Sequence, residues 1–581
     1  MADKRGSLMV NGYKVGGKVD ATLSSTSTNP IENQAIFNEL KKYGVRFTYT
    51  DNILTLVSND GTALSTATIQ SGGSNFNIPN VTNIVASKGD AIAELTWTDP
   101  NDISYEGVNL AKWGGTIVVQ KTGSAPTSKD DGTIVFTETT RNQHKTTPLT
   151  ISNLTNDTTY YFGVFPYTDT GVYNYDASQV VSVTPKHITV YGMHINGSES
   201  NPVNMITYLS DCDNAHFINT AKMNFSTGKF DWGDWANAFF IPKSCMLKYN
   251  GTVDYYLNEN DETKKVDGTA SDVGNTSYGG NAMMEWGQLW WKLVPDADGN
   301  GTNFYIAEKQ VDDTYHAYNN VDCNGKINKH FYTPKYFGSN INDKLRSISG
   351  ASNSVNTLPQ QDINLAKANN QDSNNPIWYT EVYADRLLIN LLLVMMAKNM
   401  NTQAVYGTGR CSSSNSNAIG NGTMNGKGMF WGNQDQTSGV KVFGMENWWG
   451  NIWRRVAGYM NLNNVIYTKL TYDTSDGSTV KGYNLTGEGY VRQGSIGGTN
   501  SRYISAMTYT STAIVPKTVS GSDSTYYADG CWFNGNSICY GFCGGSWNVG
   551  SRVGAFCDDL LILVSSMSPS LGAALSCKPV A

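Results

Sequence analysis

The sequence predicts a β-rich α+β protein made of several domains. The chain is long, at 581 residues, and contains 58 glycines, 33 tyrosines and 14 tryptophans. Tyrosine and tryptophan favour strands, whereas glycine favours turns. Single hydrophobic cores rarely grow beyond about 250–300 residues, so a chain of this length forms several units. We expect four parts, over residues 1–45, 46–75, 76–186 and 187–581.

Composition argues against two classes of partner. Only 16% of the residues are charged, and the net charge is −7. Without a basic stripe for phosphate groups, we expect no nucleic-acid partner. The start, MADKRGSLMV, lacks the apolar core of a signal peptide, and the longest apolar stretch, 388–396, is too short to span a bilayer. We therefore expect a soluble protein without membrane insertion.

The sequence offers no candidate catalytic or metal-binding set. The six histidines are scattered, and the nine cysteines form no CxxC pair. A zinc site would need such ligands at close, regular spacing. We expect small buried thiols, no catalytic residues, no cofactor and no metal, although the oxygen-rich run DADGNG (296–301) leaves bound calcium open.

The first two parts combine a helix with short strands. Pro30 precedes apolar residues at helical spacing, which predicts a short amphipathic helix over about 30–42. The segment LSSTSTNPIENQAI, which begins at Leu23, resembles a segment of phage tail-fibre and baseplate-attached proteins, and this resemblance implies that residues 1–45 attach to a particle. The alternative is a generic linker followed by a helix. Residues 46–70 predict two or three short strands, and SGGSN (71–75) predicts a flexible joint.

Residues 76–186 have the pattern of a β-sandwich. Apolar residues alternate around Trp97 and again around Phe162, with turn residues about every ten positions. The segments AELTWTDP and LTISNLTNDTTYYFGVFPY resemble a fibronectin type III domain. This resemblance implies that Trp97 is the core tryptophan and that Leu154 and Tyr160 form a tyrosine corner. Such a module would act as a spacer.

The last part, 187–581, predicts one large domain with a buried helix. Apolar residues at i, i+3, i+4, i+7 and i+8 predict a helix within 378–400 that packs inside the domain. The block VFGMENWWGNIWRRVAGY (442–459) resembles the Gly-Asn-Val-Trp-Glu-Trp block of the formylglycine-generating-enzyme superfamily and of retroelement-diversified lectins. That resemblance implies that Trp449 and Trp453 are buried anchors. Arg454 and Arg455 depart from the family pattern.

The tail, about 531–581, is rich in Trp, Gly, Ser and Asn, a composition that suits contact surfaces. Its blocks GGSW (544–547), GAF (554–556) and GAALSCK (572–578) resemble the C-terminal signature of retroelement-diversified variable proteins, which have a C-type-lectin fold. The resemblance implies that these blocks are scaffold and that the positions between them vary and bind a receptor. Carried over position by position, the receptor-binding residues would be Phe533, Asn534, Asn536, Phe542, Asn548, Val549, Arg552, Asp559, Leu561, Ile562, Ser566, Pro569 and Ser570.

One part of that prediction has an alternative from the residues themselves. The run Leu560 to Val564 is continuously apolar, and such a run is also typical of a fully buried strand. In that case Leu561 and Ile562 would be core residues. Periodicity does not distinguish the two interpretations.

Together these resemblances imply a tail receptor-binding protein of a phage or prophage. It would reside in the virion, attach to tail or baseplate proteins through its N-terminus, assemble as a homotrimer, and bind a glycan or protein receptor on the host cell without catalysis. A bacterial surface lectin is the first alternative. The second is an oxidase of the formylglycine-generating type, which would use Cys539 with Cys543 or Cys557.

Overall fold

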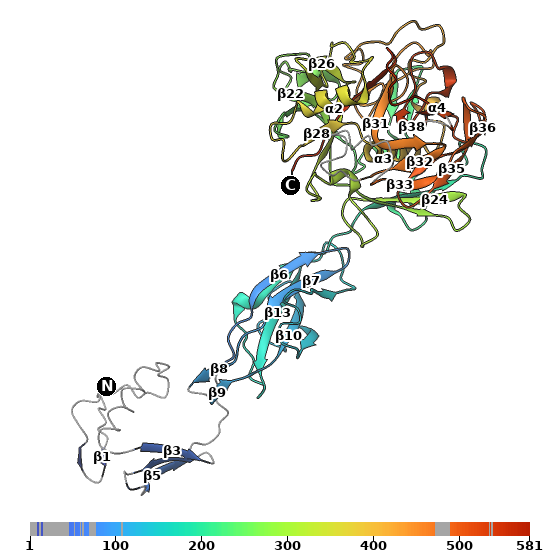
Figure 1. The fold of residues 1–581 in the computed structure, drawn as a ribbon. Coiled ribbons are helices and arrows are strands. Elements are labelled where there is room, and N and C mark those ends of the chain that lie inside the picture. The colour runs from blue at the N-terminus through green and yellow to red at the C-terminus, as the bar shows by residue number, and fades with distance from the viewer. Residues whose placement is uncertain are drawn as a thin grey trace. The chain divides into compact units, whose positions relative to one another are not determined.

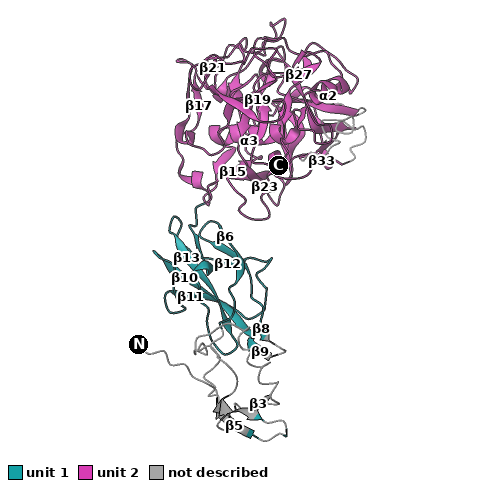
Figure 2. Ribbon diagram, turned by 90° about the vertical axis from the view of Figure 1, so that its left-hand side faces the viewer, with its two compact units in different colours: residues 1–187 teal, residues 188–581 magenta. Residues whose placement is uncertain are grey.

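The computed structural model describes residues 9–10, 13–14, 46–50, 53–57, 60, 63–68, 77–105, 108–470, 489–533, 535 and 538–580. The chain divides into two compact units, residues 1–187 and 188–581 (Figure 2). The predicted helix over 30–42, most of the predicted attachment segment and the joint at 71–75 lie outside the described residues. Among the helices that are described, none is long and apolar enough to cross a membrane.

Short strands form the beginning of the first unit. Strands β1 (Met9–Val10) and β2 (Tyr13–Lys14) pair with each other. Strands β3 (Arg46–Thr50), β4 (Ile53–Val57) and β5 (Ala63–Thr68) form a three-stranded antiparallel sheet (Figure 1). The prediction of two or three short strands over residues 46–70 is confirmed.

The rest of the first unit is a sandwich of two sheets. One sheet has the strand order β11-β10-β13-β14 and the other β12-β7-β6, while β8 and β9 form a separate hairpin. The strands are β6 (Thr82–Lys88), β7 (Ala93–Thr98), β8 (Ile103–Tyr105), β9 (Val108–Ala111), β10 (Trp113–Thr122), β11 (Thr133–Glu138), β12 (Leu149–Ile151), β13 (Tyr160–Thr168) and β14 (Val180–Val183).

Inward-facing residues of both sheets make the core of this sandwich. Trp97 on β7 is 1% exposed and packs in one cluster with Val118 on β10 and Phe162 on β13. The Tyr160 hydroxyl accepts a hydrogen bond of 3.0 Å from the Thr155 backbone N–H, which is the contact that defines a tyrosine corner. The predicted burial of Trp97 and the predicted corner at Tyr160 are both confirmed.

The second unit contains three larger sheets and several two-stranded ones (Figure 1). The four-stranded sheet has the order β16-β15-β24-β23, and the seven-stranded sheet has the order β21-β20-β19-β22-β25-β41-β28. Their strands are β15 (Val190–Asn196), β16 (Ile206–Tyr208), β19 (Lys243–Lys248), β20 (Val253–Asn258), β21 (Asp261–Lys265), β22 (Gly280–Trp286), β23 (Trp290–Pro295), β24 (Gly301–Ala307), β25 (Phe331–Pro334), β28 (Trp378–Thr380) and β41 (Leu575–Cys577).

The largest sheet has ten strands, nine of them in the order β33-β32-β31-β38-β39-β37-β35-β36-β34, with β40 paired to β31. These strands are β31 (Trp453–Leu462), β32 (Val465–Thr468), β33 (Val491–Ser495), β34 (Gly497–Gly498), β35 (Arg502–Tyr509), β36 (Ile514–Gly521), β37 (Gly530–Phe533), β38 (Ile538–Cys543), β39 (Asp558–Leu560) and β40 (Leu571–Ala573). The two-stranded sheets are β17 (Lys222–Asn224) with β18 (Lys229–Asp231), β26 (Ser339–Ile341) with β27 (Lys344–Arg346), and β29 (Lys441–Val442) with β30 (Met445–Glu446).

Few helices accompany these sheets. They are α2 (Pro359–Lys367), α3 (Tyr383–Ala397) and α4 (Thr402–Tyr406). The helix predicted within 378–400 is confirmed as α3, but it is shorter than that range, because residues 378–380 form β28 and pair with β41 near the end of the chain. That pairing joins segments almost 200 residues apart, so local periodicity does not reveal it.

All fifteen side chains of α3 are buried, including three polar ones. Asp385 accepts hydrogen bonds from Lys578 Nζ at 2.5 Å, Ser576 Oγ at 2.9 Å and Asn319 Nδ2 at 2.9 Å. A buried charge is costly unless it is paired and hydrogen-bonded. Two residues near the end of the chain, Ser576 and Lys578, therefore supply hydrogen bonds and a positive charge to the buried Asp385 carboxylate in the first turn of α3.

We expect Lys578→Met to destabilise the protein by about 3–5 kcal/mol, because the change leaves the Asp385 carboxylate buried without its cation. Thermal and urea unfolding of the full chain would measure this effect. Lys309→Met is the matched control, because Lys309 is exposed. An equal, small effect of both substitutions would show that the Lys578–Asp385 pair is not a structural requirement.

Candidate functional site

The tail forms the middle of the largest sheet. Strand β38 lies between β31 and β39, and β39 lies between β38 and β37, so each has hydrogen-bonded neighbours on both sides. Strand β41 occupies an equivalent central place between β25 and β28. The tail is thus framework of the domain, and two of its connecting segments, 544–557 and 561–570, lead away from these strands.

Most residues of the three blocks GGSW (544–547), GAF (554–556) and GAALSCK (572–578) are buried. Gly544, Gly545 and Ser546 are buried, as are residues 554–556 and 572–578. In contrast, every residue of 548–552 and of 561–570 is exposed or half-buried. The tail therefore alternates between buried blocks and solvent-accessible segments.

The thirteen predicted binding residues do not all lie at the surface. Asn548 and Pro569 are exposed, and six others are half-buried: Val549, Arg552, Leu561, Ile562, Ser566 and Ser570. Asn534 and Asn536 lie outside the described residues. Phe533, Phe542 and Asp559 are buried, at 8%, 2% and 6% exposure, so their side chains do not face a partner in this conformation.

The three buried side chains have structural contacts that the sequence did not reveal. Phe542 packs with Trp453, and the Arg455 guanidinium lies 4.9 Å from its ring centroid. Phe533 belongs to the main core cluster. Asp559 Oδ1 accepts hydrogen bonds from the backbone N–H groups of Leu561 and Ile562, at 2.9 and 3.2 Å. We therefore correct the prediction for these three residues and treat them as supports of the neighbouring loops.

The apolar run from Leu560 to Val564 was also predicted as one fully buried strand, but strand β39 ends at Leu560. Leu560 is fully buried, Leu561 and Ile562 are half-buried, and Leu563 is 43% exposed. The interpretation of Leu560 to Val564 as one fully buried strand is wrong, because β39 ends at Leu560 and the chain returns to the sheet only in a single bridge between Leu563 and Cys539.

The structure brings several accessible tail residues together. Val549 and Ile562 pack with Trp532 against the buried side chains of Trp453 and Phe542. The Trp532 ring meets the Trp453 ring edge-on, with centroids 5.5 Å apart. The Arg552 guanidinium lies 4.8 Å from the Trp532 ring centroid. We define the tail face as these accessible residues and their loop neighbours, namely Trp532, Asn548, Val549, Arg552, Leu561, Ile562, Leu563, Met567 and Pro569.

Three residues of the tail face were absent from the predicted set. Trp532 precedes Phe533 on β37, and strand alternation places it opposite the buried Phe533. Leu563 and Met567 are 43% and 51% exposed. Met567 also borders an apolar cavity of about 320 Å³ beside α2, together with Tyr540 and Val564. Of these three exposures, only that of Trp532 could have been inferred from the sequence, because neighbouring side chains on a strand point to opposite faces of the sheet.

The Arg pair that departs from the family pattern is buried and ion-paired. Arg454 donates to Glu381 at 3.0 Å, and Arg455 pairs with Asp362. Trp449 and Trp453 are 0% and 4% exposed, which confirms that they are buried anchors. Both arginines therefore stabilise the framework beneath the tail face.

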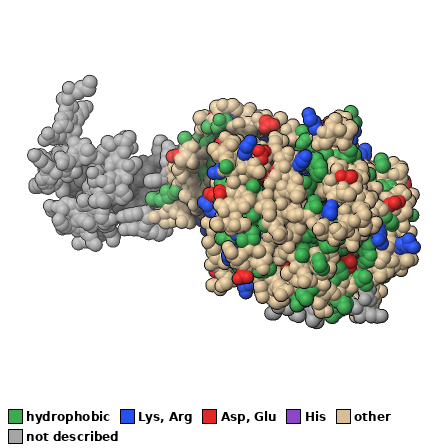
Figure 3. Space-filling model, turned by 90° about the horizontal axis from the view of Figure 1, so that it is seen from above, with side chains coloured by type: hydrophobic (Ala, Val, Ile, Leu, Met, Phe, Trp, Pro, Cys, Tyr) green, Lys and Arg blue, Asp and Glu red, His purple; other side chains and the backbone are tan. Residues whose placement is uncertain are grey.

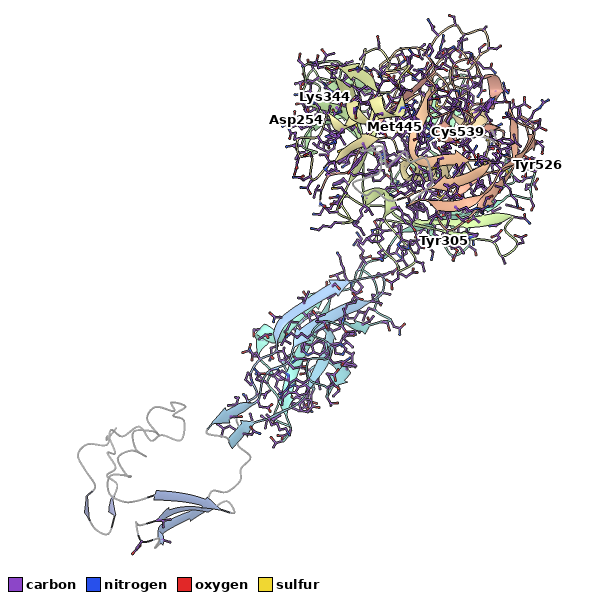
Figure 4. All side chains as sticks on the ribbon, viewed as in Figure 1. Asp254, Tyr305, Lys344, Met445, Tyr526 and Cys539 are labelled. Atoms are coloured by element: carbon purple, nitrogen blue, oxygen red, sulfur yellow. The ribbon has the colours of Figure 1, made fainter. Side chains whose placement is uncertain are left out.

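The cysteines are free, and all nine are buried. Cys539, on β38, lies inside the domain (Figure 4), and burial raises its pKa to about 12. Burial also raises the pKa of Cys543 and Cys557 well above the ordinary value. These thiols are thus protonated at neutral pH, as the sequence analysis expected of small buried thiols. In the described ranges, no three His, Cys, Asp or Glu side chains are placed to hold a metal ion.

Charged side chains are sparse on the face of the protein drawn in Figure 3. Figure 3 shows one face of the molecule on which Lys, Arg, Asp and Glu side chains are scattered singly among uncharged and apolar ones. No family model matches this chain, and a search of the curated proteins finds no match.

Two buried carboxyl groups make stability depend on pH. Burial raises the pKa of Asp558 to about 6 and that of Asp559 to about 7, from an ordinary value of 3.8. The folded protein consequently retains protons that the unfolded chain releases. This contribution to stability is fully present below about pH 4 and is lost as the pH rises through about 6 to 7.

We expect Asp559→Asn to flatten this pH dependence, because the amide oxygen still accepts from Leu561 and Ile562 but does not ionise. The midpoint of thermal unfolding, measured from about pH 4 to about pH 8, tests this. Asp313→Asn is the control, since Asp313 is exposed. A wild-type midpoint that rises steadily with pH over this range would contradict the prediction.

Proposed function

We propose that this protein is a receptor-binding protein of a phage or prophage tail. Its C-terminal unit, a C-type-lectin-like domain, presents the tail face to a receptor on the host cell. The sandwich of the first unit is a fibronectin type III-like spacer, and the N-terminal segment attaches the protein to the particle. Binding is non-covalent and needs no cofactor.

The observation that best supports this proposal is the alternation of burial along the tail. A surface that varies from copy to copy needs positions that can change without loss of the fold. Residues 548–552 and 561–570 meet this requirement, whereas the blocks that resemble scaffold are buried apart from the half-buried Trp547. Surface substitutions away from buried contacts usually alter stability by less than about 0.5 kcal/mol, so such segments tolerate diversification.

The chemistry of the tail face also suits recognition. Trp532, Val549 and Ile562 offer apolar area that is already partly packed, so little conformational entropy is lost on binding. Arg552 is held in place because its guanidinium donates to the carbonyls of Val549 and Ser501, at 3.2 and 3.0 Å. Rigid aromatic and Arg anchors are typical of binding hot spots.

The thiols argue against the oxidase alternative. That alternative needs reactive cysteines, and the thiolate is the nucleophile and metal ligand. Burial holds Cys539, Cys543 and Cys557 in the neutral form at physiological pH. Within the virion, a homotrimer would let individually weak tail faces act together through avidity.

A triple substitution on the tail face tests the proposal. We expect Leu561→Glu, Leu563→Glu and Met567→Glu together to weaken cell binding by about tenfold or more, because they place charge in an apolar contact surface. The measurement is binding of the labelled full-length protein to a panel of bacterial strains, and the variants are compared on the strains that the unmodified protein binds. Circular dichroism and thermal unfolding would verify that the variant is folded.

The matched control changes three similarly exposed residues elsewhere in the same unit. Val266, Val294 and Ile327 are 69%, 43% and 41% exposed, and each becomes Glu in the control. Binding that survives in the control but not in the tail-face variant supports the proposal. Equal binding by both variants, or no binding of the unmodified protein to any strain, would oppose it.

A further inference from the structure

The second unit also contains a cleft that includes no residue of the tail. Its volume is about 720 Å³, which lies within the range of about 300–1,000 Å³ that is usual for small-ligand sites. Residues 203–207 and 220–223, around β16 and β17, form one part of its lining. The end of α3 and the beginning of α4, residues 397–399 and 404–405, form the rest.

The cleft combines an apolar floor with polar walls. Ile206, Ala221 and Met223 are buried at its base. Asn204 and Thr207 are exposed and Thr220 is half-buried, and their side chains form no hydrogen bond to any described residue. Hydrogen-bonding groups that are free and gathered over an apolar surface are available to a ligand.

The charge of the cleft is positive, although the whole chain has a net charge of −7. Lys222 and Lys398 are the two charged residues in its lining, and neither forms an ion pair with a described carboxylate. Asp231 lies directly opposite Lys222 in the register of β17 and β18, although no ion pair joins them. Asp231 accepts from the Gly233 N–H at 3.0 Å, and Asp234 accepts from the N–H groups of residues 218 and 219 at 2.8 and 2.9 Å.

Lys398 is fixed in position by the helix that precedes it. It is the C-cap of α3 and has a left-handed backbone conformation, with φ of 49°. Its backbone N–H donates to the carbonyls of Val394 and Met395, and its ammonium group lies 4.9 Å from the centroid of the Tyr208 ring. The cap fixes the backbone of Lys398 at the cleft, and its ammonium group forms no ion pair with a described carboxylate.

We propose that this cleft is a second binding site and that its ligand is an acidic saccharide. A sugar ring has an apolar C–H face that suits Val203 and Val405, the accessible apolar side chains of the lining, and hydroxyl groups that suit Asn204 and Thr207. The carboxylate of a sugar acid would bind Lys222 and Lys398 through charge-assisted hydrogen bonds. A neutral sugar would leave both ammonium groups without a counter-charge, so the site selects acidic saccharides.

Titration of the full-length protein with trigalacturonic acid and with sialyllactose, followed by calorimetry, tests this site. Lactose is the neutral comparison. We expect at least one acidic probe to bind and lactose to bind about tenfold more weakly or not at all. Lys222→Gln and Lys398→Asn should each weaken the acidic probe by about tenfold, and asparagine tolerates the left-handed conformation at residue 398.

Lys229→Gln is the matched control, because Lys229 is an exposed lysine on the strand that pairs with β17. It should leave binding unchanged, and so should the triple tail-face variant, which separates this site from the proposed receptor surface. The proposal is overturned if neither acidic probe binds at millimolar concentration, if lactose binds equally well, or if Lys222→Gln and Lys398→Asn bind as tightly as the unmodified protein.

Discussion

The second unit depends on the hydrogen bonds that other segments make to Asp385 and Asn390, two of the three polar side chains that α3 buries. Helix α3 is enclosed on all sides, and Asp385 and Asn390 lie within it away from water. Lys578 and Ser576 bond Asp385, while the Ala555 carbonyl and the Trp448 indole bond Asn390. Because unpaired groups of this kind are expensive to bury, the tail and the helix have to fold together.

This coupling explains why one segment can serve as both framework and surface. The buried blocks of the tail are held by α3 and by central sheet positions, so the loops between them need not stabilise the domain. Asp559 illustrates the junction, because it is buried itself and yet fixes the backbone of Leu561 at the surface. A rigid support of this kind keeps accessible side chains in place while their identities change.

The two proposed sites differ in chemistry and would serve different contacts. The tail face is apolar and aromatic, and Arg552, its one charged side chain, already donates to backbone carbonyls. The cleft beside the end of α3 has free hydrogen-bonding groups and the ammonium groups of Lys222 and Lys398, which form no ion pair with a described carboxylate. A particle that carries both could combine a weak contact with surface saccharides and a selective contact with a receptor, and linked contacts of this kind raise avidity.

From the sequence by itself, length and composition determined the β-rich, multidomain character, and local periodicity determined the buried helix. The core position of Trp97 and the corner at Tyr160 were implied by the resemblance to fibronectin type III domains. The composition of the tail also indicated that this segment forms a contact surface. Only the tertiary structure decided that Phe542 and Asp559 are buried, that the strand ends at Leu560, and that Lys222 and Lys398 meet at one cleft. Those outcomes depend on contacts between segments far apart in the chain, and no local pattern records which distant side chain will cover a residue or pair with its charge.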